Sequence, residues 1–168
     1  MKPHELLQSL VSRRCWYVSS GGATAPSFML IVGDKIPRDR ELRNRHHPED
    51  YRQNRGTHEL LVWCSWRLQT NNEVLASSDQ ETDENSPLLA LAGGEIAAVE
   101  VSSPAWDIRI TFNDGRVLVV FCDHVPPAPS ASRNWECWLP GHYVEAGPGT
   151  IWRREANGRD PLQDDTLT

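Results

Sequence analysis

The sequence lacks a long apolar segment and an excess of basic residues. No uncharged apolar run approaches the ~18 residues that a membrane-spanning helix requires, and the longest such runs, residues 28–32 and 117–122, have the length of a strand. Lys and Arg number 17 against 23 Asp and Glu, which gives a formal net charge of −6. Because clustered cations provide most of the affinity for phosphate backbones, the composition argues against a nucleic-acid partner, and we expect no membrane partner.

Motifs that would indicate secretion or catalysis are also missing. The four cysteines stand alone, without a CxxC pair, and there is no N-glycosylation sequon. Polar residues interrupt the leucines of residues 1–12, a pattern that is typical of an amphipathic helix rather than a secretory signal. We therefore expect a reducing, cytoplasmic location. GxSxG, HExxH and P-loop motifs are absent, so we predict a non-enzymatic protein without a cofactor.

What is present is a core-forming composition arranged in two similar halves. Hydrophobic residues make up 39% of the 168 residues, with seven tryptophans, which is enough apolar material for one compact domain. Each half begins with a leucine-rich segment and continues through three strand-like segments in the same order. In the first half these are residues 5–10, a strand that ends at Ser20, and residues 28–34 and 61–66. In the second half they are residues 87–91, a strand that ends at Ser103, and residues 108–115 and 119–124.

The second half contains the clearest strand pattern. Apolar Ile108, Ile110 and Phe112 alternate with polar residues, which predicts a half-buried strand. The Asp-Gly pair that follows at 114–115 predicts a two-residue hairpin turn. This turn would place Phe112 opposite Val117.

These patterns predict an α+β fold, mainly antiparallel β, with about nine short strands and two short helices. Two pseudo-repeated halves, each a helix plus short strands, would form one compact sheet-rich domain. Residues 1–76 would be the first pseudo-repeat, with a long loop at 34–57, and residues 77–86 an acidic linker. Residues 87–154 would contain the second pseudo-repeat and the terminal strands, and residues 155–168 a flexible tail.

One set of residues could bind a metal or form a small active site. Cys122 and His124 share a strand face by their spacing, and Cys137 and His142 follow further along the chain. Structural zinc sites usually contain more closely spaced ligand pairs, so buried core cysteines are the simpler interpretation. A small metal-binding protein or enzyme centred on these four residues remains an alternative.

Three features indicate contacts with a protein partner. The loop at 34–57 holds seven Lys and Arg against five Asp and Glu, and long charged loops often carry function. The acidic linker is almost free of apolar residues, and Trp135 and Trp138 lie near loop-forming residues, where Trp can anchor an interface. The expected partner-binding residues are Asp79, Glu81, Asp83, Glu84, Arg38, Arg40, Arg43, Trp135 and Trp138.

Residues 58–68, 106–115 and 121–123 together resemble small uncharacterised bacterial proteins, many of which are similar to immunity proteins of polymorphic toxin systems. The resemblance implies an inhibitor that binds and neutralises a cognate toxin or effector in the cytoplasm, often through an acidic surface. The negative charge of this chain agrees with that role. An adaptor subunit of a larger bacterial assembly is a further alternative.

Overall fold

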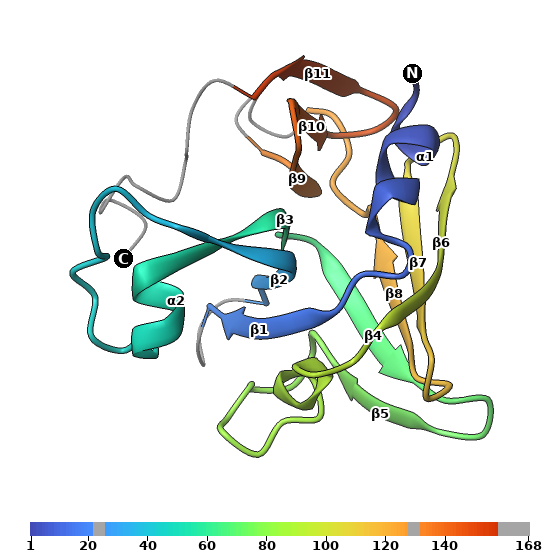
Figure 1. Cartoon of the computed structure of the whole chain (residues 1–168). Coiled ribbons are helices and arrows are strands. Elements are labelled where there is room, and N and C mark those ends of the chain that lie inside the picture. Colours follow the sequence, from blue (N-terminus) through green and yellow to red (C-terminus); the bar gives the residue numbers. More distant parts are fainter. Residues whose placement is uncertain (22–25, 128–131, 158–168) are drawn as a thin grey trace.

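The computed structural model describes residues 1–21, 26–127 and 132–157, which form two antiparallel sheets around a shared core (Figure 1). The first sheet has the strand order β1-β2-β3-β9-β10-β11, and the second has the order β5-β4-β8-β7-β6. The prediction of a mainly antiparallel β fold with little helix is confirmed, with eleven strands in the described residues rather than about nine. None of the described helices is long and apolar enough to span a membrane.

Most strands have four to seven residues, β2 and β3 are longer, and each helical element has three to five residues. The first sheet contains β1 (Cys15–Ser20), β2 (Phe28–Pro37), β3 (Asn54–Val62), β9 (Trp135–Leu139), β10 (His142–Ala146) and β11 (Trp152–Ala156). The second contains β4 (Ser65–Gln69), β5 (Val74–Ser77), β6 (Ile96–Ser102), β7 (Asp107–Phe112) and β8 (Val117–Phe121). The helical turns are α1 (Pro3–Leu6), η1 (Leu7–Leu10), α2 (Glu49–Gln53) and η2 (Leu89–Leu91).

The core lies between the inward faces of the two sheets. Alternate residues of β7 are buried, as the sequence pattern predicts for a strand with one face in the core. The helical turn α1–η1 packs against β6, and η2 packs against β1, so each turn covers the first strand of the other half (Figure 1). Leu7, Leu10 and Leu91 of these turns are completely buried.

The first sheet takes three strands, β9, β10 and β11, from the second half of the chain, and the second sheet takes two, β4 and β5, from the first half. β4 follows β3 along the sequence but pairs with β8 in the second sheet, whereas β9 follows β8 and pairs with β3 in the first. β5 and β10 then add to β4 and β9 respectively. Because each sheet depends on strands from both halves, the two sheets are expected to form cooperatively.

The two halves also meet in a reciprocal pair of backbone hydrogen bonds. The N–H of Ser12 donates to the carbonyl of Ile96 (2.8 Å), and the N–H of Gly93 donates to the carbonyl of Cys15 (2.7 Å). Both donors have a positive φ, +65° at Ser12 and +95° at Gly93. An irregularity in strand pairing follows Cys15 in β1 and Ile96 in β6.

The predicted register of the β7–β8 hairpin is wrong by one residue. The N–H of Gly115 donates to the carbonyl of Phe112 (3.0 Å), and Gly115 has a φ of +88°. This turn leaves three residues in the loop instead of two, a common arrangement in which the last loop residue is left-handed. Leu118 therefore lies opposite Ile110 and faces the core.

The predicted boundaries of the irregular segments also change. β2 continues to Pro37 and β3 begins at Asn54, so only residues 38–53 lie between these strands, and they include α2. β11 ends at Ala156, which means that the predicted tail begins inside a strand. Residues 158–168 lie outside the described part of the chain.

Candidate functional site

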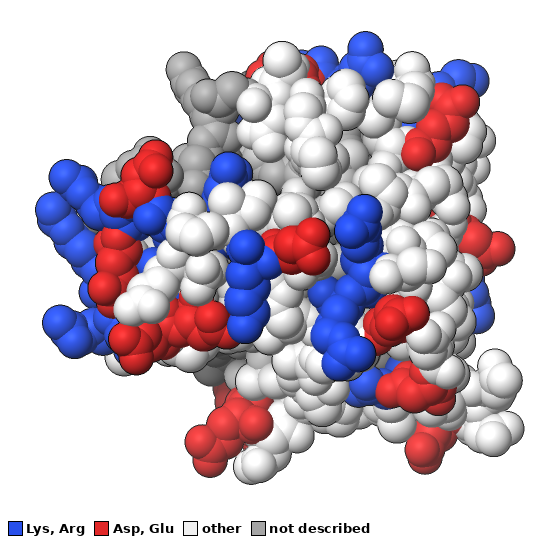
Figure 2. Space-filling model, viewed as in Figure 1, with Lys and Arg blue, Asp and Glu red and all other residues white. Residues whose placement is uncertain are grey.

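The acidic loop, defined as residues 78–87 between β5 and η2, carries all four predicted carboxylates. Asp79, Glu81, Asp83 and Glu84 are exposed, and none of them forms an ion pair with a described Lys or Arg. Figure 2 shows red side chains at the lower edge of the molecule, where this loop lies, without blue neighbours. The loop therefore presents negative charge that the described chain does not neutralise.

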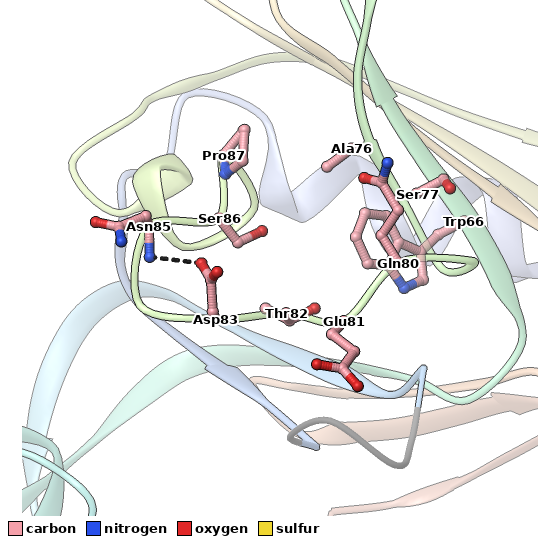
Figure 3. A pocket seen from close by; sticks show the side chains of 10 residues that line it. All are labelled: Trp66, Ala76, Ser77, Gln80, Glu81, Thr82, Asp83, Asn85, Ser86 and Pro87. Carbon is pink, nitrogen blue, oxygen red and sulfur yellow. Dashed lines mark hydrogen bonds between the residues drawn. The ribbon is translucent and has the colours of Figure 1, made fainter.

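A pocket of about 250 Å³ lies beside this loop (Figure 3). Buried Trp66 and Ala76 contribute apolar surface to it, and the loop contributes carboxylates, amides and hydroxyls. The Asp83 carboxylate accepts a hydrogen bond from the N–H of Asn85 (2.9 Å), which holds the turn that closes the pocket. The lining residues are Trp66, Ala76, Ser77, Gln80, Glu81, Thr82, Asp83, Asn85, Ser86 and Pro87.

The lining of this pocket carries no positive charge. It contains no Lys or Arg, so a ligand would meet only neutral and acidic groups. Such a pocket suits a cationic or hydrogen-bond-donating group of a partner.

The arginine-rich segment, residues 38–53, packs on the outer face of the first sheet. Tyr51 of α2 is buried there, in a second apolar cluster with residues of β2, β3 and β9. The Arg38 guanidinium lies over the Tyr51 ring, 4.9 Å from its centre, and its Nε donates to the Tyr51 carbonyl (3.1 Å). The segment is thus a packed cover of the sheet rather than a solvated loop.

Two cations in and beside this segment form ion pairs with carboxylates of the segment itself. Arg52 pairs with Glu41 (2.7 Å), and Lys35 pairs with Asp50 (2.5 Å). Blue and red side chains are intermixed over this region in Figure 2. Among the predicted arginines, Arg38 is half-buried, whereas Arg40 and Arg43 are exposed.

The two predicted tryptophan anchors do not lie on the surface. Trp135 is completely enclosed in the core, and its indole N–H donates to the carbonyl of Trp106 (2.9 Å). Trp138 is 8% exposed and packs in the second apolar cluster, beside the ring of Tyr143. β9 is covered on both faces, so neither residue fits the predicted role of an exposed anchor. Trp63 is instead the exposed tryptophan of the described chain, at 37%.

A polar network on the outer face of the first sheet went unrecognised in the sequence. The Tyr143 hydroxyl bridges the buried carboxylates of Glu136 (2.7 Å) and Glu145, and burial together with these carboxylates raises the pKa of Tyr143. Trp63 donates its indole N–H to Glu136 (2.7 Å), and Arg133 donates to Glu145 (2.5 Å). The sequence does contain one sign of this network. Glu136 stands between apolar residues of a predicted strand, and a carboxylate buried in this way requires a hydrogen-bond partner.

The predicted Cys122, His124, Cys137 and His142 do not form a metal site. No group of three or more potential metal ligands occurs among the described residues. Cys137 is completely buried within β9, and the Cys122 thiol donates to the carbonyl of Trp106 (3.3 Å). Burial raises the pKa of the Cys137 thiol, which disfavours the thiolate that a metal would need.

The pocket with its acidic loop is thus the candidate site. The polar network around Glu136, Tyr143 and Glu145 on the outer face of the first sheet is a second polar feature. Comparison with protein-family models, with curated proteins and with solved structures finds no match for this chain.

Proposed function

We propose that the protein is a non-enzymatic binding protein of the immunity type, which neutralises a cognate bacterial toxin or effector in the cytoplasm. The acidic loop is the observation that carries this proposal. Its four carboxylates are exposed and form no ion pair within the described chain, and two of them, Glu81 and Asp83, line a pocket that has no basic residue. A negative surface of this kind accelerates the encounter with a basic partner and disfavours acidic ones.

The arginine-rich segment has a smaller part in this proposal. Arg38 is engaged with Tyr51, so its first role is to hold the segment on the sheet. Arg40 and Arg43 are exposed and would contact the partner only at the margin of the interface. Exposed charges at an interface margin influence association rate more than they influence affinity.

Charge reversal of the loop tests the proposal. The tagged wild-type chain would be used to capture partners from a lysate of its own host, beside the triple variant Asp79→Lys, Glu81→Lys and Glu84→Lys. Asp83 stays unchanged because its carboxylate holds the turn at Asn85. A control variant, Glu73→Lys, Glu100→Lys and Glu155→Lys, makes the same change in net charge at exposed positions elsewhere.

We expect a single stoichiometric partner with the wild type and the control, and its loss with the loop variant. Binding to the wild type should weaken as salt rises, because charge attraction is screened. Equal capture by all three proteins would remove the loop from the interface. Absence of any stoichiometric partner would contradict a binding function, and capture of a constitutive multi-protein assembly would favour the adaptor alternative.

We also propose that the two halves are structural repeats that exchange strands. The reciprocal hydrogen bonds of Ser12 and Gly93, the matching irregularities in β1 and β6, and the crossed pairing of β4 and β9 support this view. Among the described residues, 38–53 and β11 have no counterpart in the other half, and we expect functional contacts where the two repeats differ in this way.

Separate fragments of the chain test the exchange of strands. If strands are exchanged, fragments 1–77 and 78–168 should fold only when they are mixed. A fragment that folds alone would contradict the exchange.

A further inference from the structure

Two cysteines of opposite halves flank the last residue pair of the β4–β8 ladder. Ser65 lies opposite Phe121, and Trp66 lies opposite Val120. Cys64 directly precedes Ser65 and Cys122 directly follows Phe121, so continuation of this register would bring the two cysteines opposite each other, and both belong to the same core cluster. Directly opposed residues of antiparallel strands have Cβ atoms about 4.5–5.5 Å apart, slightly more than the roughly 3.5–4.5 Å of a disulfide.

The backbone on both sides of this pair is held in place. The Ser65 hydroxyl and N–H both donate to the Asp123 carboxylate, at 2.5 and 3.4 Å. The N–H of Cys122 donates to the Asp107 carboxylate (2.7 Å), and the N–H of Cys64 donates to the Asn134 carbonyl (3.3 Å). These bonds do not involve the thiols, so they can remain when the sulfur atoms move together.

The other two cysteines have no such neighbour. Cys15 lies opposite Val32 in the first sheet, and Cys137 lies opposite Leu60 and Val144. All four cysteines are buried and free. Cys15 and Cys137 are therefore matched controls, equal in burial and different in pairing.

We propose that Cys64 and Cys122 form a site of oxidative modification, at which a peroxide converts the two thiols into a disulfide that links the two halves. One sulfur attacks hydrogen peroxide to give a sulfenic acid and water. The second sulfur then displaces a second water from the sulfenic acid. In sum, two thiols and one peroxide give one disulfide and two waters.

The environment makes this reaction slow in the native protein. The neighbouring Cys64 side chain and burial raise the pKa of the Cys122 thiol, so the reactive thiolate is scarce at neutral pH. An exposed cysteine would react sooner with the same peroxide. Thiol exchange during refolding removes this kinetic barrier, because the thiols are then accessible before the core closes.

The test uses the full chain in two treatments. The native protein is incubated with hydrogen peroxide, and a second sample is refolded from urea in a buffer of reduced and oxidised glutathione. Remaining thiols are then alkylated in denaturant, and disulfide-linked peptides are identified by mass spectrometry. We expect the Cys64–Cys122 peptide as the dominant product after refolding, and the same product, formed slowly, with peroxide.

Single variants give the controls. Cys15→Ser and Cys137→Ser should retain the cross-link, whereas Cys64→Ser and Cys122→Ser should lose it. A mixture of cysteine pairs after refolding, no Cys64–Cys122 product there, or no such product after prolonged treatment of the native protein with peroxide would overturn the proposal. The cross-linked protein should also unfold at a higher urea concentration than the reduced one, because the bond restricts the unfolded chain. A lower midpoint would show that the native positions do not fit a disulfide.

Discussion

Trp66 and Trp135 make corresponding hydrogen bonds in the two sheets. The indole N–H of Trp66 donates to the carbonyl of Pro26 (2.7 Å), and that of Trp135 donates to the carbonyl of Trp106 (2.9 Å). Each tryptophan is buried in a strand that has crossed into the sheet of the other half, β4 for Trp66 and β9 for Trp135. The two indoles therefore fasten the crossed strands to the core.

Replacing either indole should destabilise the whole fold. Trp66→Phe and Trp135→Phe each remove a buried hydrogen bond and leave a cavity, so each should lower the free energy of unfolding by about 2–4 kcal/mol. Trp16→Phe is the matched control, since Trp16 is half-buried and its indole N–H has no hydrogen-bond partner among the described residues, so it should cost less than about 1 kcal/mol. Urea unfolding followed by circular dichroism measures all three. A loss at Trp16 as large as at Trp135 would contradict the role of the buried indole hydrogen bonds.

Gly33 and Gly115 differ in surroundings although they share a φ of +88°. A Cβ at Gly33 would lie 2.0 Å from Thr57 Oγ1, whereas a Cβ at Gly115 would meet nothing within 4 Å. Gly115→Ala should therefore cost only the strain of a left-handed residue, about 1 kcal/mol. Gly33→Ala should cost at least about 2 kcal/mol, because the Thr57 side chain must also move. Equal losses in urea unfolding would show that crowding at Gly33 has no effect.

Local patterns in the sequence predict single strands well but not their partners. The alternation of Ile108, Ile110 and Phe112 depends only on neighbouring residues, and the structure shows the expected strand. The Asp-Gly pair at 114–115 is compatible with loops of two or three residues, so the sequence alone does not determine the register. The pairing of β4 with β8 and of β9 with β3 joins residues far apart in the chain, which no local pattern contains.

The candidate site, too, is only partly predictable from the local sequence. A stretch without apolar residues cannot enter a core, which predicts an exposed acidic loop, and its four carboxylates are exposed. Trp135 does not lie at the surface as predicted, because both faces of β9 are covered. The cover of the outer face includes Tyr51 from residues 38–53. Alternation along one strand does not reveal whether another segment covers its second face.

Tyr143 should contribute to stability through its two carboxylate partners. Tyr143→Phe removes the hydroxyl that bridges Glu136 and Glu145 and leaves two buried carboxylates with one donor fewer. We expect the free energy of unfolding at pH 7 to fall by about 1–3 kcal/mol, the usual cost of an unsatisfied buried group. Tyr17→Phe is the control, because the Tyr17 hydroxyl hydrogen-bonds to His47 (2.9 Å) rather than to a pair of carboxylates. A smaller effect at Tyr143 than at Tyr17 would contradict the bridging role.

Stability should fall as the pH is lowered, because His58 is buried in its neutral form. Burial, together with the charge of Arg13, lowers the pKa of His58 from 6.5 to about 4. Between these values the unfolded chain binds more protons than the folded one, so stability rises with pH in this window and is lost in acid.

The full effect of His58 is on the order of 3 kcal/mol between pH 7 and pH 4. Burial also lowers the pKa of His47, which acts in the same direction. The lowered carboxyl pKa values of Asp114 and Asp123 remove stability only below about pH 4. Urea unfolding at several pH values should therefore show a clear loss between pH 6.5 and pH 4.5. His58→Gln should flatten that part of the curve, whereas the exposed control His4→Gln should leave it unchanged. An equal slope of unfolding free energy against pH in wild type and His58→Gln would assign the loss to other groups.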